Sequence, residues 1–169
     1  MKKLYFLLLM FISCSVLAQP RIKIYAYSQV VMPGTIPVDE NGRPLRPKEL
    51  PVNYYIFAVN KSFVKINFTE VWIKGKCYKT QTSPVDSTPV ITTNYDIPDN
   101  PVKTILVPAT KLRVISISHS EACGNIKKSS SWLLNMTKHA ELIVSYFYQG
   151  KKYYIPVKKI KVLQTVAGV

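Results

Sequence analysis

The residue types that could do chemistry are concentrated in one short stretch, Ser118 to Cys123, with the sequence SHSEAC. It contains His119, Glu121 and Cys123, which are the residue types of a general base, a metal ligand and a thiol nucleophile. A reduced Cys123 within hydrogen-bond reach of His119 would make the protein a small secreted thiol-dependent hydrolase. No HxxxH or CxxC spacing supports such a site or a zinc site. We therefore expect a polar loop that ends in a disulfide cysteine.

Other catalytic arrangements are missing from the sequence. The chain has nine carboxylates, and no two of them have the spacing of a general acid and base pair. His139 is the only other histidine, and neither a P-loop nor a GxGxxG motif is present. We predict no catalytic residues, no metal and no cofactor.

The first residues have the features of a secretory signal peptide covering residues 1–18. Lys2 and Lys3 precede an apolar run, and small residues before Gln19 provide a cleavage site. We expect export to the periplasm, the outer envelope surface or the extracellular space. The alternative is that Cys14 becomes a lipidated N-terminus. No later stretch has the roughly 20 apolar residues that a membrane-spanning helix needs.

Cys77 and Cys123 remain after the leader is removed. In an oxidising compartment an even pair of cysteines in a β-rich chain favours a disulfide, here closing a loop of about 46 residues. The loop-entropy estimate for such a bridge is about 3 to 4 kcal/mol. The alternative is a pair of buried free thiols.

The strongest structural signal is a β-hairpin over Glu141 to Leu163, with its turn at Gln149–Lys152. The first arm is apolar on both faces, which is typical of a strand covered on both sides. Pro156 lacks a ladder donor, so the second arm should be an edge strand or contain a bulge. The apolar face changes phase at Lys158 and Lys159, which predicts a β-bulge there.

An earlier segment repeats this hairpin pattern. The order aromatic-x-x-Gly-Lys-x-Tyr occurs at residues 72–78 and again at 147–153. We predict a second hairpin there. The repeat fits an internal duplication, and it also fits the ordinary composition of hairpins in a chain rich in lysine and tyrosine.

Further strands follow from alternating apolar residues and turn signals. They are expected at Arg21–Met32, Val52–Val59, Phe63–Thr69 (with Val64, Ile66 and Phe68 inward), Val90–Tyr95, Lys103–Val107 and Lys111–Ser118. A change of inward parity predicts a bulge or corner at Thr69 and Glu70. Pro33–Pro51, with five prolines, should be an extended loop or a narrow hairpin, and Thr80–Pro89 a loop.

One segment, Ser129 to Ala140, has helical spacing of apolar residues. The fold class predicted from the whole pattern is all-β, an antiparallel β-sandwich that is immunoglobulin-like or related, with one short helix near residues 130–140. We expect a single β-rich domain over residues 19–169. Two subdomains, about 20–100 and 101–169, are the alternative division.

The chain is strongly basic, with a formal charge of +14, which falls to +12 without Lys2 and Lys3. Such a surface attracts anions. The alternative for edge-strand lysines is that they only prevent edge-to-edge pairing. The predicted binding residues are those of the basic C-terminal hairpin: Lys151, Lys152, Tyr153, Tyr154, Lys158, Lys159 and Lys161.

Two function classes remain. The first is a non-catalytic secreted or periplasmic protein, a binding or accessory subunit of a cell-envelope assembly. Its partner would be an acidic envelope protein, an anionic membrane surface or a polysaccharide, and nucleic acid is not expected. The second is the thiol-dependent hydrolase using Cys123 and His119.

Overall fold

The computed structural model describes residues 20–34, 38–45, 49–62, 64–94, 102–123 and 131–167. The predicted signal peptide and Cys14 lie outside these residues. The helix is α2 (Ser131–His139). The strands are β1 (Ile22–Met32), β2 (Val52–Asn60), β3 (Asn67–Ile73), β4 (Lys76–Pro84), β5 (Val90–Asn94), β6 (Val102–Val107), β7 (Arg113–Ala122), β8 (Leu142–Tyr148), β9 (Lys151–Val157), β10 (Lys161–Val162) and β11 (Val166–Ala167).

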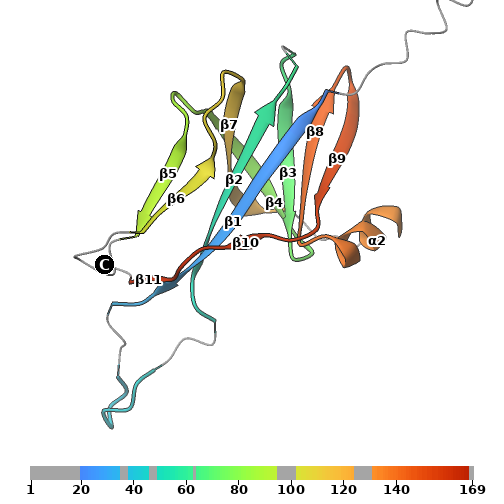
Figure 1. Ribbon diagram of the computed structural model, residues 1–169. Coiled ribbons are helices and arrows are strands. Elements are labelled where there is room, and N and C mark those ends of the chain that lie inside the picture. The colour runs from blue at the N-terminus through green and yellow to red at the C-terminus, as the bar shows by residue number, and fades with distance from the viewer. Residues whose placement is uncertain are drawn as a thin grey trace, which may run out of the picture.

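The strands form one large curled sheet and one small sheet (Figure 1). The large sheet has the order β10-β1-β2-β7-β4-β3-β8-β9, and β11 also pairs with β1. All its pairs are antiparallel except those that β10 and β11 make with β1. The predicted all-β, sandwich-like class with one short helix is confirmed.

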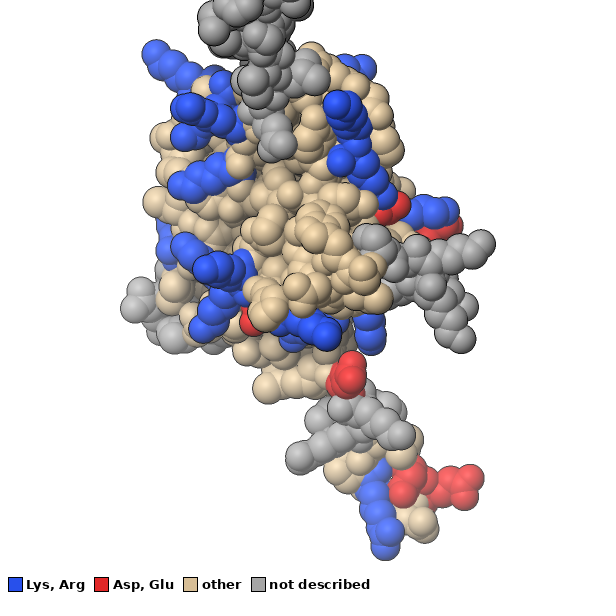
Figure 2. Space-filling model, turned by 90° about the vertical axis from the view of Figure 1, so that its right-hand side faces the viewer, with Lys and Arg blue, Asp and Glu red and all other residues tan. Residues whose placement is uncertain are grey.

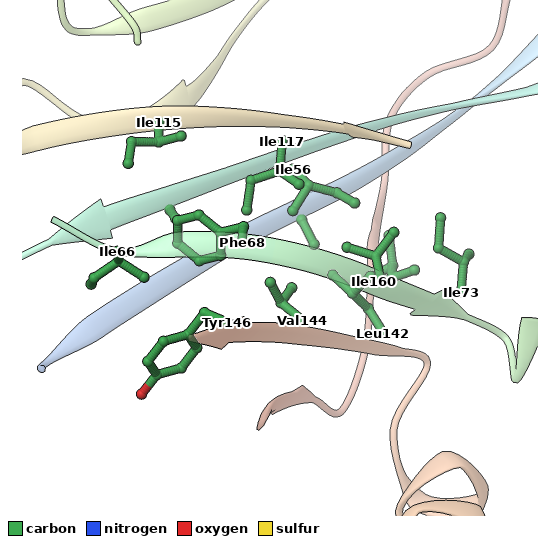
Figure 3. Close-up of a cluster of buried hydrophobic side chains, with 13 residues drawn as sticks. Ile56, Ile66, Phe68, Ile73, Ile115, Ile117, Leu142, Val144, Tyr146 and Ile160 are labelled. Carbon is green, nitrogen blue, oxygen red and sulfur yellow. The ribbon is translucent and has the colours of Figure 1, made fainter. Parts of the chain in front are cut away.

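The inner face of the curled sheet forms the main core. Figure 3 shows Ile56 and Ile117, from β2 and β7, pointing toward Leu142 and Val144 from β8. Strands on opposite sides of the curl therefore bury their apolar side chains against each other. Apolar surface contributes about 25 cal/mol per Å² when it is buried, so this layer stabilises the fold.

Two separate elements cover the outer face of the sheet. The β5–β6 hairpin contributes Leu106 and Val107 to a cluster with Phe57 and Val114 of β2 and β7. Helix α2 places Leu133 against the other half. The helix predicted over 129–140 is confirmed as α2, and Figure 1 shows both elements outside the large sheet.

Strand β8 is buried on both faces, as the sequence predicts. Leu142 and Val144 lie in the inner core, Ile143 lies in the outer cluster under α2, and all three are fully buried. Ser145, also fully buried, hydrogen-bonds to the neighbouring strand β3.

The hydrogen bonds of Ser145 pair polar groups at the predicted bulge in β3. The register of β3 on β8 shifts between Phe68 and Glu70, which leaves Thr69 as the extra residue. The Ser145 hydroxyl is 2.9 Å from the Thr69 hydroxyl and donates to the Glu70 carbonyl at 3.2 Å. A buried polar side chain thereby pairs the backbone that the bulge removes from the ladder.

Both predicted hairpins are confirmed, and they have the same turn conformation. Lys74 and Gly75 have φ of 48° and 80°, and Gln149 and Gly150 have φ of 48° and 73°. Positive φ at both central residues defines the type I′ turn, in which glycine avoids the steric strain of a side chain. The two hairpins are neighbours in one sheet because β3 pairs with β8.

Two predicted loops are wrong because strand pairing continues through polar sequence. The segment predicted as a loop from Thr80 belongs to β4 as far as Pro84. Its partner β7 extends to Ala122, so most of the predicted loop Ser118–Cys123 is also strand. The outward side chains of both segments are exposed, and an exposed strand face is normally polar. Their polarity therefore did not indicate a turn. Val64, predicted inward, is 40% exposed, because β3 begins only at Asn67.

The predicted bulge at Lys158 and Lys159 is also wrong. Strand β9 ends at Val157, and the chain crosses to the opposite edge of the sheet, where Lys161 pairs with Tyr27 of β1. Ile160 enters the inner core, and its backbone N–H donates to Glu141 at 2.7 Å. The change of apolar phase therefore marks a strand crossover.

The last described residues are anchored to β1. Leu163 donates from its backbone to Ser28 at 2.8 Å, and the buried Gln29 side chain donates to the Gln164 carbonyl at 3.0 Å. Residues 38–45 of the proline-rich segment lie outside the sheet and form a narrow hairpin with a bridge between Val38 and Pro44, as expected (Figure 1).

The inner core gives a test of the fold. Replacing fully buried Leu142 with alanine should lower the free energy of unfolding by about 2 to 5 kcal/mol, because the cavity removes apolar contacts. Leu112→Ala is the matched control, since that leucine is 39% exposed, and it should change the free energy by less than about 1 kcal/mol. Urea denaturation measures both. Equal effects of the two variants would contradict the assignment of the core.

Candidate functional site

The disulfide predicted between Cys77 and Cys123 is present in the structure. Their Cα atoms are 5.2 Å apart, and the Cys123 backbone N–H donates to the Cys77 carbonyl at 2.9 Å. The bridge lies in the outer cluster with Trp72 and Leu133, under helix α2. The bridge joins β4 to the end of β7. We interpret it as a structural disulfide.

The bridge can be tested directly. Cys77→Ala should lower the free energy of unfolding by about 2 to 4 kcal/mol, because the unfolded chain regains the entropy of the open loop. Denaturation in urea without reductant measures this change. Non-reducing peptide mapping of freshly exported protein should recover the two cysteine peptides joined. Recovery of both peptides as free thiols would refute the bridge.

The structure does not bring Cys123 and His119 together as a nucleophile and its base. The Cys123 sulfur is bonded to Cys77, and the His119 ring lies between the rings of Tyr54 and Tyr78. Among the described residues, no group of three or more His, Cys, Asp and Glu side chains could hold a metal ion. The stretch predicted to be richest in chemistry therefore forms strand pairing, an aromatic contact and a disulfide.

The predicted binding residues of the C-terminal hairpin lie on β9, β10 and the crossover between them. Lys151, Lys158 and Lys159 are exposed. Lys161 is also exposed and lies on β10 at the other edge of the sheet, with its amine 5.9 Å from the Tyr27 ring centre. These four exposed lysines are called the lysine rim below.

Lys152 has a different environment from the lysine rim. Its amine is 2.6 Å from a Glu70 carboxylate oxygen, and both side chains are less than one-third exposed. The same amine lies 5.7 Å and 5.6 Å from the ring centres of Trp72 and Tyr154. Lys152 therefore stabilises the pairing of β3, β8 and β9 and is not a free cation for a partner. No local pattern in the sequence indicated that Glu70 would be its partner.

The two adjacent tyrosines of β9 point to opposite faces of the sheet. Tyr154 packs on the outer face between Trp72 and Trp132, at ring-centre distances of 5.7 Å and 5.4 Å. Trp132 of α2 is 55% exposed, so these rings form an amphipathic surface beside β9. Sequence reasoning placed Trp132 on the helix but did not place it beside Tyr154.

Tyr153 instead points inward and stacks on Tyr146, with ring centres 5.4 Å apart and planes inclined by 20°. Burial raises the pKa of Tyr146, and the neighbouring Tyr153 raises it further. Both effects disfavour the phenolate in the folded protein. Tyr153 is therefore part of the inner packing and is less available to a partner than its sequence position suggests.

This raised pKa predicts a pH dependence of stability. The contribution of Tyr146 is fully present below its unfolded pKa of about 10 and is lost as pH rises through the higher folded pKa, because the unfolded chain releases the proton first. Urea denaturation at pH 9 to 11 should show the free energy of unfolding falling with pH. Tyr146→Phe should show a shallower fall. An identical slope in the two proteins would contradict the raised pKa.

Charge is distributed unevenly over the side of the molecule on which Figure 1 places β9 and α2. Figure 2 shows this side: lysine and arginine side chains lie around the margin, and the centre is largely uncharged. Among the described residues of β9 and the crossover, Lys151, Lys158 and Lys159 are exposed, and the exposed Trp132 packs against Tyr154 of β9. An amphipathic partner with acidic groups at its periphery would match this arrangement.

A pocket of about 710 Å³ opens at one end of the curled sheet, and no residue of β9 lines it. Tyr54, Tyr78 and His119 line it, from the three adjacent strands β2, β4 and β7. Sequence reasoning noticed His119 as a catalytic type and missed the two tyrosines. Side chains alternate between the two faces of a strand, so Tyr54 lies on the same face of β2 as the core residue Ile56. This alternation could have predicted that Tyr54 points inward.

Comparison with known proteins found no matching family model, curated protein or solved structure. In the part of the chain that is described, no helix is both long and apolar enough to span a membrane. The interpretation of function therefore depends on the chemistry of these surfaces alone.

Proposed function

We propose that this is an exported, non-catalytic binding or accessory subunit of a cell-envelope assembly, which recognises an acidic partner through the surface around β9. The observation that carries the proposal is an edge strand, β9, whose only described strand partner is β8, placed beside exposed aromatic side chains and the lysine rim. The signal-like leader and the structural disulfide support an oxidising destination.

The hairpin geometry indicates which backbone groups a partner strand could use. In a hairpin with a two-residue turn, the closing residues Tyr148 and Lys151 form a hydrogen-bonded pair, and such pairs recur at every second residue. The peptide groups of Lys152 and Tyr154 therefore point away from β8. The backbone of Pro156 also points away from β8, so the missing N–H of proline removes no hydrogen bond to β8. An extended peptide could pair with this edge by β-augmentation.

The lysine rim would supply the charge complementarity. Lys151, Lys158 and Lys159 are exposed and form no ion pair with any described residue. Charges at the rim of an interface mainly increase the association rate and select partners of opposite sign. Their effect should be strongly salt-dependent, because the Debye length falls from about 10 Å at 0.1 M to about 3 Å at 1 M ionic strength.

The proposal predicts the behaviour of a charge-neutralised variant. Replacing the four residues of the lysine rim with glutamine should weaken retention on envelope fractions of the native cells about tenfold or more at 0.1 M salt. Lys152 is left unchanged because it pairs with Glu70. The thermal unfolding of the variant should remain close to that of the parent. Co-sedimentation measures retention, and vesicles containing phosphatidylglycerol distinguish a lipid surface from a protein partner.

A matched control removes the same charge elsewhere. Lys23, Lys61, Lys103 and Lys111 are exposed, and none of them lies on β9 or β10 or lines the pocket described above. Their fourfold replacement with glutamine should reduce retention much less than the rim variant. Equal retention of the rim variant and the parent across the salt range would show that the contact lies elsewhere and that the rim lysines only protect an edge.

A further inference from the structure

The inward-facing residues at one end of the curled sheet form an aromatic pocket that the proposed function does not use. Tyr54, His119 and Tyr78 lie on the neighbouring strands β2, β7 and β4, so their rings form a row across the sheet. The His119 ring meets the Tyr54 ring at 5.9 Å and 80°, and the Tyr78 ring at 5.3 Å and 71°. These edge-to-face contacts fix the orientation of the imidazole.

The polar groups of this row are not used by the described part of the protein. Neither tyrosine hydroxyl and neither ring nitrogen of His119 forms a hydrogen bond with a described residue. Thr80 lies directly opposite His119 in the β4–β7 pairing, and its buried hydroxyl has no hydrogen-bond partner among the described residues. The two hydroxyls and the imidazole nitrogens of the pocket are therefore available to hydrogen-bond a molecule that enters it.

The charge at the pocket entrance selects the sign of that ligand. Lys74 and Lys76 line the pocket together with Glu49, and none of these three side chains forms an ion pair with a described residue. The entrance therefore has an excess positive charge, in a chain that is strongly basic overall. A concave site lined by one sign of charge concentrates ions of the opposite sign.

We infer that this pocket, lined by Tyr54, Tyr78, His119, Lys74 and Lys76, is a binding site for a small ring compound that carries an acidic group. The tyrosine and histidine rings provide a face for the ring of the ligand, the hydroxyls and imidazole nitrogens bind its polar substituents, and the lysines bind its anion. A volume of about 710 Å³ lies within the usual range for small-molecule sites. An acidic sugar and an aromatic acid share this chemistry.

The two histidines of the chain make a direct test possible. His119 lines the pocket, and His139 lies exposed at the end of α2, so their ring signals in an NMR spectrum serve as reporter and internal reference. Glucuronic acid and benzoate are the two probes, and glucose and benzyl alcohol are their uncharged counterparts. We expect at least one acid to shift the His119 signal saturably, with a dissociation constant of about 1 mM or lower, and to leave His139 unchanged.

Two double variants test whether Lys74 and Lys76 bind the anion. Lys74→Gln with Lys76→Gln should weaken binding of the acid at least fivefold, and both side chains are exposed, so the fold should be retained. Lys103→Gln with Lys111→Gln, away from the pocket, is the matched control and should leave the affinity unchanged. Binding of glucuronic acid alone would identify a sugar site, and binding of benzoate alone an aromatic-acid site.

The inference is overturned if neither acid shifts the His119 signal at 20 mM. It is also overturned if the uncharged counterparts bind as tightly as the acids, or if the two double variants behave alike. None of these results depends on the lysine rim around β9. Failure of the pocket and failure of the proposed function can therefore be distinguished.

Discussion

The burial of β8 on both faces constrains the rest of the structure. Leu142 and Val144 need a cover on the inner side and Ile143 needs one on the outer side, so the sheet has to curl and the chain has to supply an outer layer. The curl provides the first cover, and α2 with the Cys77–Cys123 region provides the second. A slip in the register of β8 would separate the buried Ser145 hydroxyl from the β3 bulge to which it is hydrogen-bonded. Ser145 can be buried only because the β3 bulge lies opposite it.

The candidate surfaces follow from that arrangement. Because β8 is held by β3, the hairpin places β9 at the margin of the sheet, where its second side has no described strand partner. Because the sheet curls, its inner face is accessible only at its ends, and one end carries the row of Tyr54, His119 and Tyr78. The same core therefore produces a strand edge and an end pocket, and the two surfaces have different chemistry.

The sequence predicted the parts of the fold that depend on local patterns. Both hairpins, the strand covered on two faces, the short helix and the bulge at Thr69 were predicted from periodicity and turn residues, whereas the turn type was seen only in the structure. Polar strand residues were missed at Thr80–Pro84 and His119–Ala122, because their cross-strand partners lie far away in the sequence. The pocket was missed for the same reason, since strand order alone brings Tyr54, Tyr78 and His119 together. The partner of Lys152 required knowing that β3 and β9 flank β8.

The crossover after β9 has a consequence for stoichiometry. Lys161 and Val162, with Val166 and Ala167, pair alongside the second half of β1, so the chain itself occupies much of that margin of the sheet. The margin formed by β9 remains the longer uninterrupted edge among the described strands. Within the large sheet, a strand added at β9 would therefore find no equally open edge at β1. If a partner adds a strand to this sheet, the described strands offer it one place and not two.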